Sequence, residues 1–398
     1  MLTPDQAEAA IAARLTPLGS EACPLERADG RVLREAILAD LDQPPFDRVA
    51  MDGIAFVESE FAGGRRSFRI AGVVAAGAPP ATLDAPGTCL EVMTGAVLPP
   101  GTDTVVPVED VAVQHGVACV ADTASVTPFG NVHRQGTDAR AGAQLLASGA
   151  RLRGPEIAIA ASAGRTSLLV SREPRIAVIS TGDELVPPGT RPAAWQVRRS
   201  NAYGIAATLR QHGFGRLTDD HVTDDPARIR AALARHLETH DALVLSGGVS
   251  AGRFDHIPGV LAELGVQQVF HKVAQRPGKP MWFGTRPDGR TVFALPGNPV
   301  STLVCLIRYV VPALVRLVGG VPPGPAFAPL AARWEQRHGL TTFLPVDLLE
   351  GGDRPGALTP HPTHGSGDFA ALAGTSGFVE LAPASRWEPG SLAPFYTW

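Results

Sequence analysis

The sequence predicts a multidomain protein that combines α/β and β architecture around a doubly wound parallel sheet. Three observations lead to this expectation. The chain has 398 residues, more than a single hydrophobic core usually serves. Residues 174 to 322 alternate strand-like and helix-like segments, as in an α/β/α domain with a parallel sheet. Short β-branched runs between glycines and prolines fill residues 53 to 139 and 323 to 398.

The expected α/β domain, residues 174 to 322, contains two clear buried-strand patterns, "RIAVIS" and "DALVLS", which lead into the turns "TGDEL" and "GGVS". Of the two helices expected between them, one stops at Gly213 and the other has Asp225 as its N-cap. A third strand and turn, "ALPGNPVSTLV", has Asn298 as the cap of the next helix, whose N-terminus would attract anions. Ligands of such sheets bind beyond the carboxyl ends of the strands, where these turns lie.

The flanking segments predict three further parts. Residues 53 to 139 read as a small β domain, and residues 323 to 398 as a C-terminal β domain of barrel-like form. We expect residues 1 to 52 and 140 to 173 to pack together as a discontinuous helical linker domain. Its first helix carries a capping box that begins at Thr3.

Composition excludes several classes of function. The net charge of −4 comes without a basic stripe, which argues against a nucleic-acid surface. The four cysteines lie far apart and show no metal or disulfide spacing, so a reducing cytoplasm is expected. The apolar stretch 299 to 320 is interrupted by Arg308, Pro312 and Arg316, and it predicts a buried or dimer-facing helix in a protein without a membrane span.

Acidic residues on the glycine-rich turns predict a cation site. Asp183, Glu184 and Asp255 would bring carboxylate oxygens to one edge of the sheet, where Mg²⁺ could bridge a phosphate. The alternative is that Asp183 and Glu184 only cap the next segment. The glycines, Gly182, Gly247 and Gly248, suit a loop whose amides hold phosphate or pterin.

Other short motifs are weaker. "GVSAG" around Ser250 matches the nucleophile elbow of serine hydrolases, but Asp255 follows too closely to be the usual acid of that triad. "GSGDFA" around Ser366 lacks the strand and helix of a dinucleotide site. His361 and His364 stand among prolines that oppose a metal-binding helix.

Lysine is almost absent from the chain. Lys272 and Lys279 are the only two, both in "HKVAQRPGKP", against 33 arginines. A codon bias towards arginine could leave two such survivors by accident. Alternatively, a compact ammonium fits a tight oxyanion pocket that a planar guanidinium does not.

Seven ordered motifs resemble one known family. "PPFDRVAMDGIAF", "MTGAVLPPGTDTVVPVED", "STGDEL", "DDPARIRAAL", "SGGVSAGRFD", "KVAQRPGKP" and "LPGNPVS" resemble the molybdopterin molybdenumtransferases, the MoeA and gephyrin E-domain family, across residues 3 to 390. The resemblance implies an elongated four-domain homodimer that inserts molybdate into adenylyl-molybdopterin with Mg²⁺ and releases AMP. It also implies a molybdopterin adenylyltransferase upstream and molybdoenzymes downstream.

The resemblance also implies which residues form the site. The catalytic set would be Asp52, Thr94, Asp138, Glu184, Asp255, Lys272 and Lys279, with Glu184 and Asp255 holding the metal. The set that binds substrate would be Gly182, Asp183, Gly247, Gly248, Ser250, Arg276, Asn298, Ser301 and Ser366.

The chain departs from the family pattern at four of the matched positions, Ile54, Arg199, Arg276 and Pro345. Pro345 stands where the family has an arginine, which leaves the molybdate pocket one cation short unless Arg198 or Arg199 replaces it. Two alternatives to the transferase stay open, the first because of Pro345 and Arg199 and the second because of the motif around Ser250. One is a weakened paralogue that binds molybdopterin or acts as a scaffold, and the other is a serine hydrolase.

Overall fold

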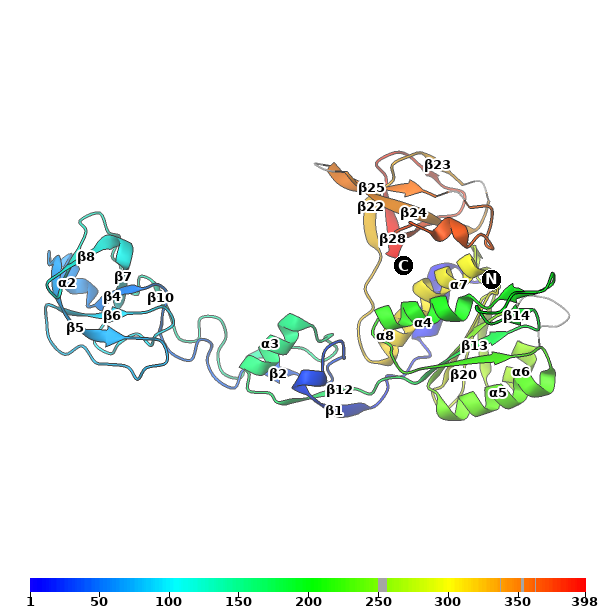
Figure 1. The fold of residues 1–398 in the computed structure, drawn as a ribbon, viewed down its shortest axis with the longest axis horizontal. Helices are drawn as coiled ribbons and strands as arrows, with labels where there is room; N and C mark the ends of the chain where they lie inside the picture. Colours follow the sequence, from blue (N-terminus) through cyan, green and yellow to red (C-terminus); the bar gives the residue numbers. More distant parts are fainter. Residues whose placement is uncertain (250–255, 337, 352–353, 362) are drawn as a thin grey trace. The chain divides into compact units, whose positions relative to one another are not determined.

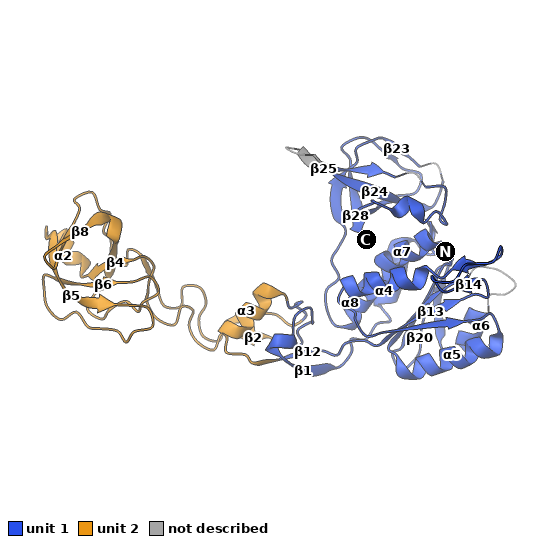
Figure 2. Cartoon of the chain, viewed as in Figure 1, with its two compact units in different colours: residues 1–34, 149–152, 168–398 blue, residues 35–148, 153–167 orange. Residues whose placement is uncertain are grey.

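The computed structural model describes residues 1–249, 256–336, 338–351, 354–361 and 363–398. The chain divides into two compact units, coloured separately in Figure 2. Unit 1 comprises Met1–Arg34, Gly149–Leu152 and Leu168–Trp398, and unit 2 comprises Glu35–Ser148 and Arg153–Ser167. The finer division into four domains stays a prediction.

The sheet of the α/β part of unit 1 is mixed. Its strands follow the order β16 (Leu217–Val222), β13 (Ile176–Thr181), β17 (Ala242–Ser246), β21 (Thr291–Leu295), β20 (Trp282–Thr285) and β18 (Gln267–His271). The strands from β16 to β21 are parallel, as predicted. The strand β20 runs antiparallel to both of its neighbours, which the sequence reading did not anticipate.

Helices cover both faces of this sheet, which confirms the α/β/α class (Figure 1). The helix α4 (Asn201–Gln211) lies on one face, and α5 (Pro226–Thr239) and α6 (Ile257–Glu263) lie on the other. Residues of β13 pack into the hydrophobic cores on both faces of the sheet, because successive side chains of a strand point to opposite faces. Ile176 and Val178 belong to the core with α4, and Ile179 belongs to the core with α5.

The long apolar helix, residues 299–317, is part of the core. It consists of α7 (Pro299–Cys305), a π-helical turn η3 (Leu306–Val310) and α8 (Val311–Leu317). Pro312 has no N–H to donate to the carbonyl of Arg308. Just before it, the N–H of Val311 donates to the carbonyl of Leu306, five residues back, which makes this turn π-helical. The helix is apolar enough to cross a membrane, but its most apolar window is 78% buried inside the protein, as expected of a core helix.

The N-terminal helix α1 (Pro4–Ala12) has the predicted capping box at Thr3. The linker domain expected from residues 1 to 52 and 140 to 173 stays a prediction, and the helix itself packs within unit 1. Ala7 and Ile11 are buried in the same core as α4 and α8. Leu2 forms a parallel bridge with Val273, which places the start of the chain beside the lysine-bearing segment.

The C-terminal part of unit 1 is a barrel-like β structure. Its sheet contains β19 (Gln275–Arg276), β24 (Thr341–Gly351), β26 (Gly377–Leu381), β28 (Leu392–Thr397), β22 (Ala326–Pro329) and β25 (Arg354–Pro360). A bridge between Leu330, next to β22, and Leu358 of β25 brings the two ends of the sheet together. The pairs β14 (Leu185–Val186) with β15 (Val197–Arg198), β23 (Trp334–Glu335) with β27 (Arg386–Trp387), and β1 (Ser20–Pro24) with β12 (Ser167–Ser171) complete the strands of this unit.

Unit 2 is built on another mixed sheet. The strands are β7 (Thr104–Pro107), β4 (Gly53–Phe56), β6 (Thr88–Val92), β5 (Ser67–Val74), β9 (Val117–Val120) and β8 (Val111–Gln114), in that order. Smaller elements are β2 (Ile37–Leu38), β3 (Arg48–Val49), α2 (Glu58–Ala62), β10 (Val132–His133), β11 (Gln144–Leu146) and α3 (Gly154–Ser162). The predicted β character of residues 53 to 139 is therefore present.

Candidate functional site

Glycines form the turns at the carboxyl ends of β13 and β17. Gly182, Gly247 and Gly248 have φ values of 141°, 101° and 67°, a region that residues with a Cβ rarely adopt. A Cβ on Gly247 would lie 2.8 Å from the carbonyl oxygen of Thr181, and one on Gly248 would lie 2.7 Å from Ile257. The turns therefore need glycine, because a side chain at Gly247 or Gly248 would meet its neighbours.

A cavity of about 330 Å³ lies at these turns. Its lining residues are Thr181, Gly182, Glu184, Asp224, Gly247, Gly248, Val249, Pro280, Pro296, Gly297 and Asn298. It thus gathers one acid that the sequence analysis selected, Glu184, and one that it missed, Asp224. Asp224 follows β16 at the same edge of the sheet, so recognising "LTDDHV" as a strand would have found it.

Asp183 has a structural contact instead. Its carboxylate accepts a hydrogen bond from the backbone N–H of Asp224 at 3.1 Å, and it does not line the cavity. Asp183 therefore binds the backbone of a distant segment and does not cap the next one, whereas Glu184 lines the cavity. Ser250 and Asp255 lie outside the described residues.

The acids of this cavity are compatible with Mg²⁺. No group of three or more His, Cys, Asp or Glu side chains that could hold a metal occurs in the described part of the chain. However, Mg²⁺ usually keeps several waters and binds through one or two carboxylates together with substrate phosphates. Glu184 and Asp224 supply two carboxylates beside glycine-rich turns, which fits that pattern.

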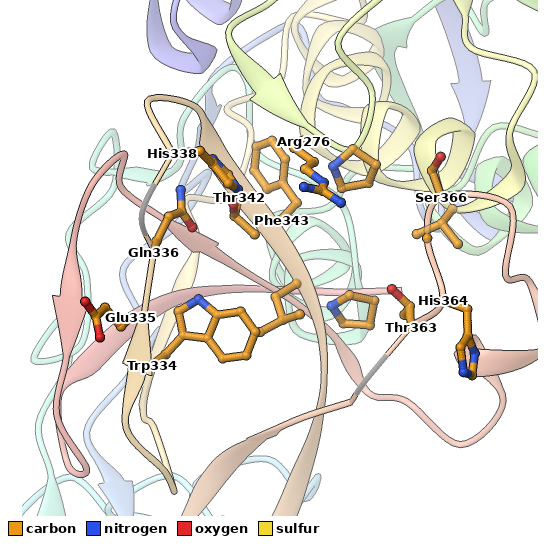
Figure 3. Close-up of a pocket in the computed structure, with 15 residues that line it drawn as sticks. Arg276, Trp334, Glu335, Gln336, His338, Thr342, Phe343, Thr363, His364 and Ser366 are labelled. Atoms are coloured by element: carbon orange, nitrogen blue, oxygen red, sulfur yellow. Dashed lines mark hydrogen bonds between the residues drawn. The ribbon is translucent and has the colours of Figure 1, made fainter.

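A larger cavity of about 750 Å³ has a different chemistry. It is lined by Arg276, Pro277, Val300, Trp334, Glu335, Gln336, His338, Thr342, Phe343, Leu344, Pro345, Thr363, His364, Gly365 and Ser366. Figure 3 shows Trp334 and His338 on the side away from Ser366 and His364. Arg276 is the arginine of this lining, so the cavity can attract an anion.

Asn298 connects the two cavities. It lies at the N-cap position of α7, as predicted, but its side chain makes no capping hydrogen bond. Its Nδ2 donates instead to the hydroxyl of Ser366 at 2.7 Å. Asn298 lines the smaller cavity and Ser366 the larger one. Ser301, in the first turn of α7, is 3% exposed and lines neither of them.

The two lysines flank a backbone hairpin between the cavities. The N–H of Lys272 donates to Met281, and the N–H of Val273 donates to Lys279, both at 2.9 Å. Arg276 and Pro277 line the larger cavity, and Pro280 lines the smaller one. Among the hydrogen bonds and ion pairs of the described residues, none involves the side chain of Lys272, Arg276 or Lys279. The hairpin thus carries three cationic groups that are free to meet an anion.

Arg199 is occupied by another contact, so it does not supply the cation that the family resemblance leads us to expect at Pro345. Its guanidinium forms a bidentate ion pair with Asp219, at 2.9 and 2.7 Å, and its side chain is 12% exposed. Pro345 itself lies in β24 and lines the larger cavity. His361 and His364 contact different aspartates, Asp347 and Asp368, in the loops and strands of this part.

The remaining candidate residues lie in unit 2. Asp52 accepts hydrogen bonds from the N–H and the hydroxyl of Thr94, each at 2.6 Å. These bonds lower the pKa of Asp52 below its ordinary value, because they stabilise the carboxylate. Asp138 contacts the ring of His133 at 2.9 Å. Ile54 is buried in the core of this unit.

Comparison with known proteins agrees with these observations. The MoeA N-terminal region (domain I and II) matches residues 2–164, and a probable molybdopterin binding domain matches residues 177–316. Two solved molybdopterin biosynthesis MoeA proteins from Pyrococcus horikoshii cover the whole chain. They have TM-scores of 0.79 and 0.85 at 29% and 23% identity, and 99% and 100% of those chains are covered.

Curated relatives are similar over most of their length. A molybdopterin molybdenumtransferase of Synechocystis is 41% identical over 394 residues, which are 98% of this chain and 97% of the relative. Molybdopterin molybdenumtransferase 2 of Mycobacterium tuberculosis is 36% identical over 310 residues, 75% of each chain. The chain therefore belongs to the molybdopterin molybdenumtransferase family.

Proposed function

We propose that this protein inserts molybdate into the dithiolene of adenylyl-molybdopterin and releases AMP, a step in the biosynthesis of the molybdenum cofactor. The observation that carries this proposal is that the hairpin of residues 272 to 281 contributes to two cavities of different chemistry. The smaller cavity offers glycine-rich turns and carboxylates, and the larger one offers Arg276. A reaction between an anion and a phosphate-bearing pterin requires both environments side by side.

The smaller cavity suits the phosphate and pterin end of the substrate. The N–H groups of Gly182 and Gly247 donate to the carbonyls of Val222 and Leu295, so among the three turn glycines the N–H of Gly248 is the candidate donor to a ligand. The hydroxyl of Thr181 is buried, lines the cavity and has no hydrogen-bond partner in the described part of the chain. A bound ligand would satisfy it. Mg²⁺, held there by Glu184 and Asp224 and by Asp255 as the family resemblance suggests, would neutralise phosphate oxygens.

The protein's own groups then divide the work. Glu184 or Asp224 accepts a proton from a water molecule that attacks the adenylyl phosphorus; the phosphoanhydride bond breaks, AMP is released and the other phosphate stays on molybdopterin. Arg276 and Lys279 hold molybdate by charge, and the hydroxyl of Ser366 is available as a further donor. Lys272 faces substrate phosphate in this scheme. Because Pro345 supplies no charge, the binding of an anion in the larger cavity depends on the guanidinium of Arg276.

The residues of unit 2 enter the proposal through a homodimer. The family resemblance assigns Asp52, Thr94 and Asp138 to the active site, with the Asp52 segment contributed by a partner subunit. The hydrogen-bonded pair of Asp52 and Thr94 forms a rigid acidic group suited to such a contribution. The mass of the protein in solution tests this part, and a fully active monomer would refute it.

The chemistry also defines the neighbours of this step. An adenylyltransferase must supply adenylyl-molybdopterin, and molybdoenzymes must accept the product. We place the step in the cytoplasm, because all four cysteines are free thiols.

The decisive experiment follows AMP release from adenylyl-molybdopterin with Mg²⁺, in the presence and absence of molybdate. We expect release to depend on molybdate, and Glu184→Gln to slow it on the order of a hundredfold by removing a charge at the phosphate. Glu263→Gln is the control, because Glu263 is 62% exposed on α6 and lines neither cavity. Release that ignores molybdate would favour a molybdopterin-binding paralogue instead.

A further inference from the structure

A buried polar cluster lies beneath the hairpin that carries Arg276 and Lys279. Gln275 in β19 is 0% exposed, whereas the next residue, Arg276, is exposed and lines the larger cavity. A buried amide is costly unless it is hydrogen-bonded. The partners of Gln275 therefore show what this residue holds in place.

Gln275 uses both ends of its amide. Its Nε2 donates to the carbonyl of Pro277 at 3.0 Å and to the thiol sulfur of Cys305 at 3.5 Å. Its Oε1 accepts a hydrogen bond from the hydroxyl of Tyr309. The amide thus ties the turn backbone to the long helix, with Cys305 at the end of α7 and Tyr309 in η3.

Cys305 makes a second contact with the same turn. Its thiol donates to the carbonyl of Gly278 at 3.7 Å. Burial raises the pKa of the thiol to about 12, so it stays protonated and able to donate. Burial also raises the pKa of the Tyr309 hydroxyl, which therefore remains a donor to Gln275.

The turn has no room to shift against this cluster. Gly278 has a φ of 93°, and a Cβ there would lie 2.5 Å from the Gln275 amide and 2.6 Å from the Cys305 sulfur. The carbonyls of Pro277 and Gly278 are the acceptors, and Arg276 and Lys279 stand on either side of them. A substitution in the cluster should therefore shift the backbone of Pro277 and Gly278, and with it both Arg276 and Lys279.

We propose that Gln275, Tyr309 and Cys305 are positioning residues, which fix the turn so that Arg276 and Lys279 present their charges to one oxyanion. They touch no substrate themselves. This inference rests on the proposed function, in which those two cations hold molybdate.

The test compares two tyrosines. Tyr309→Phe removes the hydroxyl that orients Gln275. Tyr396→Phe is a matched control: its hydroxyl also lies in unit 1, donates to Glu380 at 2.9 Å and has a raised pKa. Both rings lie near the Arg308 guanidinium, at 5.4 and 5.5 Å. The variants therefore differ chiefly in whether the lost hydroxyl contacts Gln275.

We expect Tyr309→Phe to raise the KM for molybdate by about threefold to tenfold, as the loss of one hydrogen bond implies, and to change kcat less. Hydrogen exchange, read by mass spectrometry, should become faster at the amides of Lys272 and Val273, which close the hairpin. Tyr396→Phe should change neither quantity. Equal effects in both variants would mean general loosening and would overturn the proposal.

Cys305 gives a second test if Tyr309→Phe fails to fold. Cys305→Ser keeps a donor towards Gly278 and should stay near the parent, whereas Cys305→Ala should raise the molybdate KM and the exchange rate. If the parent shows no molybdate-dependent release, the proposed function fails, but hydrogen exchange still decides whether the cluster fixes the turn. Unchanged exchange in both Tyr309→Phe and Cys305→Ala would overturn it.

Discussion

The side-chain amide of Asn298 donates a hydrogen bond to the hydroxyl of Ser366 at 2.7 Å. The two residues belong to different cavities and to different parts of unit 1, the α/β sheet and the barrel-like β structure. The N–H of Val300 strengthens the same junction by donating to the carbonyl of Ser366 at 3.2 Å. The boundary between the smaller and the larger cavity is therefore a fixed contact.

A double-mutant cycle can measure this contact. Asn298→Ala and Ser366→Ala should each lower kcat/KM for molybdate by about threefold to tenfold, because one hydrogen bond is lost in each. The double variant should be little worse than the poorer single variant, since both changes remove the same bond. Ser391→Ala, in a distant turn where Ser391 accepts from Glu388, is the control. Fully additive effects would show that the two residues act independently.

The two lysines should respond differently to arginine. Lys279 follows the tightly seated Gly278, and we expect Lys279→Arg to weaken the dependence of AMP release on molybdate, because a planar guanidinium is broader than an ammonium. Lys272→Arg should act less if Lys272 meets phosphate, which arginine binds well. The measurement is AMP release over a range of molybdate concentrations. If Lys279→Arg matches the parent throughout, the rarity of lysine is only a codon effect.

Arg308 should matter for stability. Its side chain is 4% exposed and forms ion pairs with Asp5, Glu8 and Glu380. Arg308→Met removes the charge that these acids face, and we expect a loss of about 3 to 5 kcal/mol in the free energy of unfolding, as for other broken buried pairs.

Arg316 provides the control for that experiment. It is 41% exposed and approaches Glu8 at 3.5 Å, so Arg316→Met should cost no more than about 1 kcal/mol. Chemical denaturation of both variants gives the comparison. Equal costs would show that the buried network contributes no more than a surface pair.

Asp241 should contribute to acid sensitivity. Burial alone would raise its pKa, but hydrogen bonds from the Arg172 guanidinium at 2.9 and 2.8 Å and from the N–H of Arg175 outweigh this and lower it below the ordinary 3.8. A carboxylate with a lowered folded-state pKa stabilises the protein above its unfolded pKa, and this stabilisation disappears as the pH falls through the folded value.

We therefore expect Asp241→Asn to lower stability at neutral pH and to flatten the loss of stability below about pH 4. Urea denaturation at several pH values measures both effects. Asp122→Asn is the control, because the Asp122 side chain is 89% exposed. An unchanged pH profile in Asp241→Asn would contradict the assignment.

Signals within a few residues of each other made much of the fold predictable. The capping box at Thr3 and the Asp225 cap both form as expected. Gly213 ends its helix with a φ of 88°. The parallel strands could be predicted because runs such as "RIAVIS" are apolar on both faces, as strands covered by helices on each side must be.

What the sequence did not predict depends on contacts between distant segments. The reversal of β20 is set by its pairing with β18 and β21. Asp224 enters the smaller cavity only because β16 pairs with β13. The burial of Gln275 follows from its contacts with Cys305 and Tyr309, which lie 30 and 34 residues away along the chain. No local pattern marks such a glutamine as different from a surface one.

The position of α1 has a consequence for how the chain is made. Ala7 and Ile11 are synthesised before the residues of unit 2, yet their core includes Leu317 and Val318, which come after them. During translation the residues of unit 2 are made after α1 and before the partners of α1 in α4 and α8, so α1 cannot complete its apolar contacts until unit 2 has been synthesised. Unit 2 uses residues no later than Ser167, so it can fold while unit 1 is still being synthesised. Within unit 1, the bridge from Leu2 to Val273 can close only after residue 273 has been made, so the lysine hairpin gains this support after the residues of unit 2 are complete.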